Sequence, residues 1–260
     1  MVKTKISALI DGRLVVRGYD IAELIATASF ADCVHLLLSG ELPEAGARRV
    51  IEAILVSCID HGVNAPSIHV ARASASCGIP ISTAVAAGIA SIGKHHGGAG
   101  EECARLLQEA ASGSGTPREQ AARIVGGAID AGKNLPGFGH RDYKETDPRT
   151  AALFEVARNN AHYSDHCRLA EMIVEELERR KGWRLVLNID GAHAAILSDL
   201  GYHWSRVQSF FLIGRSVGLC AHVHEEVEGG RPLGYLGSSR VEVGYEGPEG
   251  RRIEPAETEA

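Results

Sequence analysis

The sequence predicts a mainly α-helical fold with small β additions at both ends. Apolar side chains recur at three- and four-residue spacing through most of the chain after residue 29, which is the period of an amphipathic helix. The exception near the start is Asp11-Gly12 between two apolar runs, a pair that supplies the positive φ angles of a tight hairpin turn. Aromatic residues make up only 5% of the chain, so aliphatic side chains must form most of the core.

The expected elements follow in order along the chain. A hairpin joins Ile6–Ile10 to Arg13–Arg17, and Ser29 caps a helix that ends at Gly40. The helices expected after it are Glu44–Cys58, Ser67–Cys77, Ile81–Ile92, Gly98–Ala111, Pro117–Ala131, Asp147–Asn160, Ser164–Arg180, Asp190–Leu200 and Ser205–Glu228. Thr116 is a strong helix start, because proline follows it and Glu119 stands three residues later.

The C-terminal segment has a different pattern. Arg240–Tyr245 and Arg251–Ile253 are typical of a short hairpin or loop, and Glu254–Ala260 is expected to be a frayed tail. No internal repeat and no low-complexity block interrupts the helical pattern before it.

The composition is that of an ordinary globular protein. The 260 residues carry 27 basic and 33 acidic side chains, a formal net charge of −6, which disfavours broad nucleic-acid binding. There is no apolar run of roughly 18–20 residues that could span a membrane, and the first ten residues do not resemble a signal peptide. The six cysteines form no CxxC pair, which is typical of a reducing compartment. We therefore expect a cytoplasmic protein that binds neither membranes nor nucleic acid.

Four segments place histidine, glycine, aspartate or arginine at predicted helix boundaries, where unpaired backbone groups make ligand sites common. They are Asp60–Asn64, Lys94–Glu101, Gly137–Arg149 and Leu187–Asp190. Taken singly, each has a structural explanation: Asp190 is a good helix N-cap, and Arg149 could form a surface ion pair with Asp147. The sequence holds no HExxH motif, Cys/His quartet, GxSxG motif, P-loop or complete dinucleotide fingerprint, so we expect no bound metal.

Taken together, these segments resemble the citrate synthase superfamily along nearly the whole chain. The matching motifs, in the family's order, are Ile10–Gly12, Arg17–Ile21, Leu36–Pro43, Asp60–Asn64, His96–Ala99, Gly137–Arg141, Asp147–Arg149, Asn188–Asp190 and Gly214–Arg215. Only Glu44–Ile59 stands where citrate synthases have a long helical insertion. The short form is most similar to citryl-CoA lyase and to the lyase module at the end of ATP-citrate lyase, although that module often lacks the histidine retained here as His96.

The resemblance implies a helical fold with a large domain, residues 1–112 and 207–260, and a small mobile domain, residues 113–206. It also implies a homo-oligomer, a dimer or higher, for which the apolar residues of Ile81–Ile92 and Gly98–Ala111 are either interface or interior core. The implied ligands are a CoA thioester and a dicarboxylate or tricarboxylate, with no covalently bound cofactor. ATP-driven formation of citryl-CoA would belong to a separate synthetase.

The implied reaction is cleavage of citryl-CoA to acetyl-CoA and oxaloacetate. By resemblance, His140 contacts the hydroxyl that becomes the oxaloacetate carbonyl, His96 donates a hydrogen bond to the thioester oxygen, and Asp190 handles the proton of the acetyl carbon. We expect the dipole of the following helix to keep His96 neutral, and burial to raise the pKa of Asp190.

The resemblance also assigns the binding residues. The residues expected to bind the substrate carboxylates are His61, Arg149 and Arg215, with Asn64 on the same wall of the site. Arg231 or Arg240 of a neighbouring subunit would complete this set. The residues expected to bind CoA are Gly137, Phe138, Gly139, Arg141 and Lys144. Two alternatives remain open: a compact citrate or 2-methylcitrate synthase, and a non-catalytic CoA-binding or partner subunit.

Overall fold

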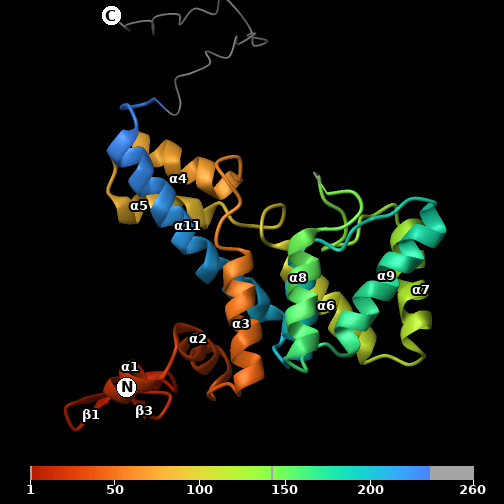
Figure 1. The fold of residues 1–260 in the computed structure, drawn as a ribbon, viewed down its shortest axis with the longest axis horizontal. Helices are drawn as coiled ribbons and strands as arrows, with labels where there is room; N and C mark the ends of the chain where they lie inside the picture. Colours follow the sequence, from red (N-terminus) through yellow and green to blue (C-terminus); the bar gives the residue numbers. More distant parts are fainter. Residues whose placement is uncertain (1, 142, 235–260) are drawn as a thin grey trace, which may run out of the picture.

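The computed structural model describes residues 2–141 and 143–234, and over these residues the chain is mainly helical. Eleven α-helices, one 3₁₀ helix and one three-stranded sheet are present in this part of the chain (Figure 1). The predicted fold class is confirmed. No helix among the described residues combines the length and the apolar character that crossing a membrane requires.

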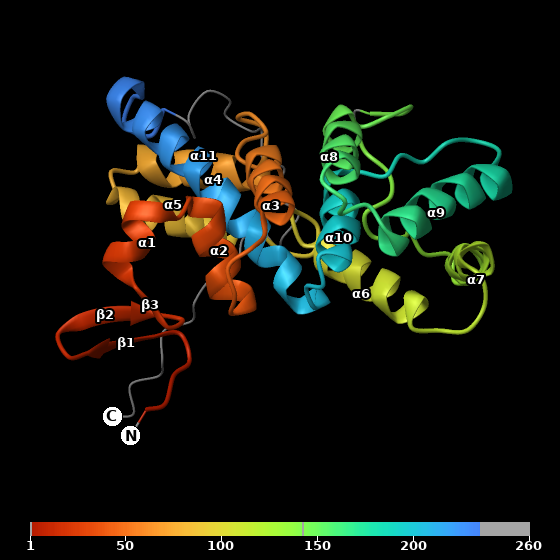
Figure 2. The ribbon, with the colours of Figure 1, turned by 60° about the horizontal axis from the view of Figure 1, so that its bottom comes forward.

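The N-terminal hairpin is confirmed. β1 (Ser7–Ile10) pairs antiparallel with β2 (Arg13–Val16), and Asp11-Gly12 form the turn with φ angles of 48° and 77°. The structure adds two short elements, β3 (Tyr19–Asp20) beside β2 and α1 (Ile21–Thr27), whose first turn is capped by the Asp20 carboxylate. Figure 2 shows this sheet projecting away from the helices.

The predicted helices are confirmed, and their ends agree with the prediction to within about two residues. They are α2 (Phe30–Ser39), α3 (Ala45–Ser57), α4 (Pro66–Ser76), α5 (Ile81–Ala90), α6 (Ala99–Ala111), α7 (Pro117–Asp130), α8 (Pro148–Asn159), α9 (Asp165–Lys181), α10 (Ile189–Asp199) and α11 (Val207–Gly229), the last preceded by a 3₁₀ turn, Trp204–Arg206. Ser29 and Thr116 both form capping boxes, with Asp32 and Glu119 respectively. Local capping chemistry therefore sets these helix starts.

Three apolar clusters hold the described helices together, and the smallest consists of Cys58, Ile92 and Phe211. The main one joins α2 and α3 to α6–α10 and to the start of α11, so it runs across the expected boundary between residues 112 and 113. A smaller one joins α4 and α5 to the second half of α11. The buried face of α6 packs on α10 within the chain, whereas α5 leaves more than half of its residues at least partly exposed. In Figures 1 and 2, α3 lies beside α8, and the two helices are in contact.

The strands or loops expected at Arg240–Tyr245 and Arg251–Ile253, and the tail Glu254–Ala260, lie outside the described residues.

Candidate active site

Segments far apart in the sequence converge on one cavity of about 170 Å³ between the helices. Its lining comprises Ser57, Cys58, His61, His95, His96, Gly97, His140, Arg149, Asn188, Ile189, Asp190, Phe211 and Arg215. All three residues expected to be catalytic and the three of this chain expected to bind carboxylates are in that set. The cavity therefore brings together imidazole, carboxyl and guanidinium groups around a space large enough for a small ligand.

Asn188 joins the loop that carries His140 to the helix that carries Asp190. Its side-chain amide donates to the carbonyl of Gly139 at 2.9 Å, and its side-chain oxygen accepts from the backbone N–H of Asp190 at 3.0 Å. Asn188 is also the N-cap of α10. One side chain thus caps the helix and sets the two walls of the cavity relative to each other.

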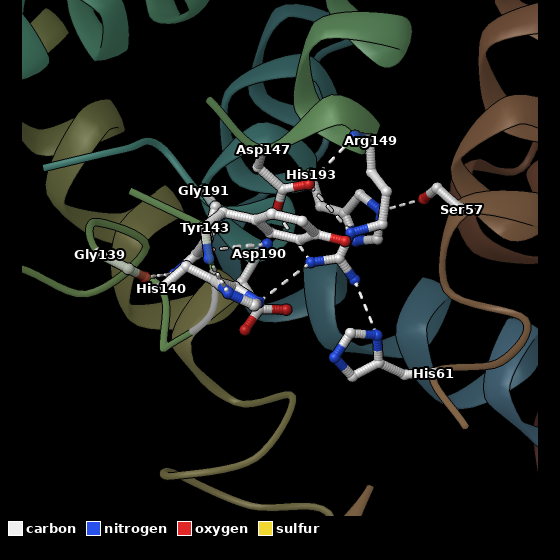
Figure 3. A network of polar contacts seen from close by, with 11 residues as sticks. Ser57, His61, Gly139, His140, Tyr143, Asp147, Arg149, Asp190, Gly191 and His193 are labelled. Atoms are coloured by element: carbon white, nitrogen blue, oxygen red, sulfur yellow. Dashed lines mark hydrogen bonds and ion pairs between the residues drawn. The ribbon is translucent and has the colours of Figure 1, made fainter. Parts of the chain in front are cut away.

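The ring of His140 faces two donors. The backbone N–H of Tyr143 donates to Nδ1 at 3.1 Å, and NH2 of Arg149 lies 3.4 Å from Nε2 (Figure 3). Because the amide at Nδ1 can only donate and is the shorter contact, the neutral ring carries its proton on Nε2. That nitrogen faces Arg149 and the cavity.

The guanidinium of Arg149 lies between His61 and His140. Asp147, the N-cap of α8, accepts from its Nε at 3.0 Å and from its NH2 at 2.8 Å. NH1 lies 3.5 Å from Nδ1 of His61, and Figure 3 shows the guanidinium reaching toward the two histidines. The ion pair with Asp147 considered from the sequence is present, but it is not a surface pair, because Asp147 is only 1% exposed. It orients Arg149 toward the cavity instead.

Arg215 is held from α11 and is only 3% exposed. Its Nε donates to the carbonyl of Cys58 at 2.9 Å, and its guanidinium lies 4.9 Å from the centre of the Phe211 ring. Its NH1 has no hydrogen-bond partner among the described residues, although it is buried. A buried cationic N–H without an acceptor at the wall of a cavity suits an anionic ligand such as a carboxylate.

His96 lies in a tight turn before α6, where Gly93 and His96 exchange backbone hydrogen bonds at 2.8 and 2.9 Å. The backbone N–H of Ser67 donates to Nε2 at 3.3 Å, and the Ser67 hydroxyl lies 2.8 Å from the same atom. Nε2 is therefore an acceptor, and the neutral ring carries its proton on Nδ1. Burial lowers the pKa of His96, and the charges of Arg215 and His61 lower it further. The direction of this shift agrees with the sequence prediction.

Asp190 is the second residue of α10. Burial raises the pKa of Asp190 to about 6, against the opposing effect of Arg149 and Arg215. The predicted direction and cause both agree with this. A carboxyl group with a pKa near 6 can both release and accept a proton close to neutral pH.

The loop expected to bind CoA divides into a packed part and an open part. Gly137 has a φ of 83°, and a Cβ there would lie 2.8 Å from Cys103 Sγ and from Gly191 Cα, so this glycine permits close packing. Phe138 is 8% exposed and belongs to the main core. Arg141 and Lys144 are exposed. The burial of Gly137 and Phe138 leaves Gly139, Arg141 and Lys144 as the accessible residues of the five.

A second cavity of about 200 Å³ lies beside this loop. Its lining includes Gly139, Lys133, Lys181 and Trp183, and Nζ of Lys181 lies 5.2 Å from the centre of the Trp183 ring. Sequence reasoning missed Lys133, Lys181 and Trp183, because Lys133 follows α7 and Lys181 ends α9, two helices that are distant in the sequence.

Some expected residues are not at the cavity. Asn64 is exposed and does not line it. Arg231, which is expected to reach the site of a neighbouring subunit, lies exposed beyond the end of α11, and Arg240 lies outside the described residues.

The structure also places a polar pair that the sequence did not reveal. Ser57 Oγ lies 2.7 Å from Nε2 of His193, which is 2% exposed, and burial lowers the pKa of His193 to about 3. Neither residue belongs to a recognisable motif. No group of three or more His, Cys, Asp or Glu side chains in residues 2–141 and 143–234 is arranged to hold a metal ion.

Comparison of the sequence with known families gives one matching description, "Citrate synthase, C-terminal domain", over residues 1–49 and 43–234. Among curated proteins, "Putative citrate synthase 2" of Mycobacterium tuberculosis is 32% identical over 180 residues, which cover 68% of this chain and 47% of that protein. The chain thus spans about half the length of the curated relative it matches.

Two solved structures extend the comparison. Citryl-CoA lyase from Hydrogenobacter thermophilus is 41% identical, with a TM-score of 0.88 and 98% of each chain covered. ATP citrate lyase from Methanothrix soehngenii, solved with citrate and coenzyme A, is 24% identical with a TM-score of 0.79, covering 98% of this chain and 42% of that one. The second likeness shows a shared fold.

Proposed function

The chain belongs to the citrate synthase family, and we propose that it is a citryl-CoA lyase that cleaves citryl-CoA to acetyl-CoA and oxaloacetate. The observation that carries this proposal is the convergence of His96, His140 and Asp190 with two arginines on one cavity. The likeness to a citryl-CoA lyase over 98% of both chains supports the same reaction.

The cleavage breaks the bond between the carbinol carbon and the methylene carbon of the thioester arm. The hydroxyl, whose oxygen accepts a hydrogen bond from Nε2 of His140, loses its proton to the Asp190 carboxylate and becomes the carbonyl of oxaloacetate, while the electron pair of the broken bond moves into the thioester unit. Nδ1–H of His96 donates to the thioester oxygen, where negative charge develops. A hydrogen-bond donor aimed at such an oxygen lowers the activation barrier by about 3 kcal/mol. Asp190 then protonates the methylene carbon and gives the methyl group of acetyl-CoA.

One proton passes from the hydroxyl to the carbon through Asp190. Before cleavage Asp190 is ionised and takes the hydroxyl proton, while the neutral ring of His140 donates from Nε2 to the same oxygen, with the Arg149 guanidinium 3.4 Å from that nitrogen. Asp190 then gives the proton to the methylene carbon and is ionised again. A pKa near 6 lets Asp190 both accept and release this proton near neutral pH.

The cationic groups of the cavity suit the carboxylates of the substrate. We assign one carboxylate to Arg215, whose NH1 is buried and has no acceptor in the described chain, and another to Arg149 and His61. Guanidinium groups bind carboxylates through two parallel hydrogen bonds, which an ammonium group cannot do. A neighbouring subunit would add Arg231 or Arg240.

For the CoA end we propose the open part of the loop and the second cavity beside it. Gly139 lines that cavity and leaves backbone room, and Arg141 and Lys144 follow on the exposed side of the loop. Lys133 and Lys181 supply positive charge for phosphate groups, and Trp183 supplies an aromatic face for the adenine.

We also propose that residues 113–206 move as the small domain. In support, the cavity takes His61, His96 and Arg215 from one part and His140, Arg149 and Asp190 from the other.

A homodimer or larger oligomer would bring a second copy's C-terminal arginine to each site. The six free cysteines agree with a cytoplasmic location, and a separate synthetase would form citryl-CoA from citrate with ATP.

A compact citrate or 2-methylcitrate synthase is the second candidate. The observation that favours it is the full set of His96, His140 and Asp190, since the carbon–carbon step is the same in both directions. The two functions differ in whether the thioester of citryl-CoA is hydrolysed.

The test uses authentic citryl-CoA with a malate dehydrogenase assay for oxaloacetate and a thiol assay for free CoA. A lyase releases oxaloacetate and acetyl-CoA from citryl-CoA, so oxaloacetate appears without free CoA thiol. A synthase hydrolyses citryl-CoA to citrate and CoA, and it releases thiol from acetyl-CoA or propionyl-CoA plus oxaloacetate. Absence of oxaloacetate from citryl-CoA would overturn the lyase proposal, and absence of both reactions would indicate a non-catalytic subunit. Citramalyl-CoA and methylcitryl-CoA in parallel define the acyl chain.

A further inference from the structure

One side of α11 holds the segment that presents His61 to the cavity. Arg215, Gly218 and His222 stand at i, i+3 and i+7, so they share a face of the helix. Nε of Arg215 donates to the carbonyl of Cys58 at 2.9 Å. A Cβ at Gly218 would lie 2.2 Å from the carbonyl oxygen of Ile59, so only glycine lets the segment approach this closely.

His222 is the third contact of this face. Its Nε2 lies 3.1 Å from Oδ1 of Asp60, and Oδ2 of Asp60 accepts from the backbone N–H of Gly62 at 3.0 Å. Burial raises the pKa of Asp60, but hydrogen bonds from the backbone of Gly62 and of His61 and the contact with His222 outweigh it, so the net pKa is lowered. Asp60 thus links the α11 helix to the two peptide groups on either side of His61.

The position of the His61 ring depends on this turn. His61 is exposed rather than packed in the core, and it follows α3 in a loop where Gly62 has a φ of 74°. Its ring meets NH1 of Arg149 at 3.5 Å and lies edge-on to the ring of His140, with 6.1 Å between the ring centres. A small rotation of the backbone at residues 60–62 would move the His61 ring away from both Arg149 and His140.

From this geometry we propose that His222 is a positioning residue, which holds the turn at residues 60–62 through Asp60 and so sets the affinity of His61 and Arg149 for a substrate carboxylate. His222 does not line the cavity. The inference rests on the proposed function, because it takes His61 and Arg149 as carboxylate ligands.

The test compares His222→Gln, which keeps an N–H donor near Asp60, with His222→Phe, which keeps a ring and removes the donor. His224→Gln, an exposed histidine on the same helix, is the matched control. The readouts are kcat and KM for citryl-CoA cleavage, the Kd for oxaloacetate by calorimetry, and Tm. For His222→Phe we expect KM and Kd to rise about five- to tenfold with kcat within about twofold, and for His222→Gln values near those of the wild type.

A double-mutant cycle with His61→Ala separates positioning from a merely structural role. If His222 acts through His61, His222→Phe adds no further rise in Kd once His61 is alanine. An equal rise in both backgrounds would overturn the inference, as would a lower Tm with unchanged KM and Kd. If the wild type neither cleaves nor makes citryl-CoA, the proposed function fails, and the oxaloacetate cycle still decides the role of His222.

Discussion

Arg215 donates its Nε–H to the carbonyl of Cys58 at 2.9 Å, and within the described chain its NH1 is buried with no acceptor. Burial lowers the pKa of Arg215, and neighbouring acidic groups oppose this. A guanidinium whose NH1 has no acceptor in the free protein gains one when an anionic ligand binds. The unpaired donor therefore lowers the stability of the free protein, and the hydrogen bond formed with the ligand increases the affinity.

We expect Arg215→Met to weaken ligand binding without weakening the fold. Methionine fills a similar volume and removes an incompletely paired buried charge, so Tm should equal or exceed that of the wild type. The Kd for oxaloacetate should rise at least about 30-fold, because charge-assisted bonds to the carboxylate are lost. Thermal unfolding and calorimetry measure the two effects. A clearly lower Tm would show that the guanidinium serves the fold instead.

We expect Asp190→Asn to stabilise the protein near neutral pH. The raised folded-state pKa of Asp190, about 6, means that the folded state binds this proton more tightly than the unfolded state does. Stability from this group therefore falls as pH rises from about 4 through 6, and the penalty above pH 6 is about 2–3 kcal/mol. Asparagine removes it, so Tm should rise at pH 7 and match the wild type near pH 4. Equal Tm values at both pH values would contradict burial of the carboxyl group.

The pH dependence of the reaction should be the same in both directions. Cleavage moves a proton from the hydroxyl to carbon, and the enzyme neither gains nor loses a proton overall. Both directions therefore use the same protonation state of the enzyme. That form has the neutral His140 ring with its proton on Nε2 and Asp190 ionised, and it dominates above the pKa of Asp190, about 6. We expect kcat/KM to rise with pH up to about 6 and then level off, measured for cleavage and for condensation. A fall through this range would indicate a cationic His140 instead.

Replacing His96 should affect the chemical step more than binding. His96→Ala removes the Nδ1–H that we assign to the thioester oxygen, and we expect kcat to fall by about 10²–10³-fold. The Kd for oxaloacetate should stay within about threefold, since the carboxylates are assigned to other residues. Single-turnover rates and calorimetry give the two values. A parallel loss of oxaloacetate affinity would place His96 among the carboxylate ligands.

Gly137 and Gly139 form a matched pair that separates packing from ligand access. Both have positive φ, 83° and 99°, so alanine at either is strained by about 1 kcal/mol. At Gly137 a Cβ also meets Cys103 and Gly191 at 2.8 Å, whereas at Gly139 the first neighbour, Leu185, is 3.4 Å away. We expect Gly137→Ala to lower the free energy of unfolding by at least about 2 kcal/mol more than Gly139→Ala does. Gly139→Ala should instead raise KM for the CoA thioester. Equal destabilisation would contradict this division.

Most helix boundaries were predictable because local chemistry sets them. Ser29 and Thr116 cap their helices within four residues of sequence, and the Asp11-Gly12 turn needs no distant contact. The elements that sequence analysis did not separate, β3 and α1, are short. Short elements carry too few periods of hydrophobic alternation to be told from a loop.

The sequence by itself determined the helical fold, its caps and the residue types of the cavity, because periodicity, capping and motifs are properties of neighbouring residues. Only the tertiary structure decided how those residues work together. The tautomers of His96 and His140 depend on the amides of Ser67 and Tyr143, and the pKa of Asp190 depends on burial. The contacts of His222 with Asp60 and of Ser57 with His193 join residues more than 130 positions apart. Such contacts leave no local pattern, because only the packed helices bring their partners within hydrogen-bonding distance.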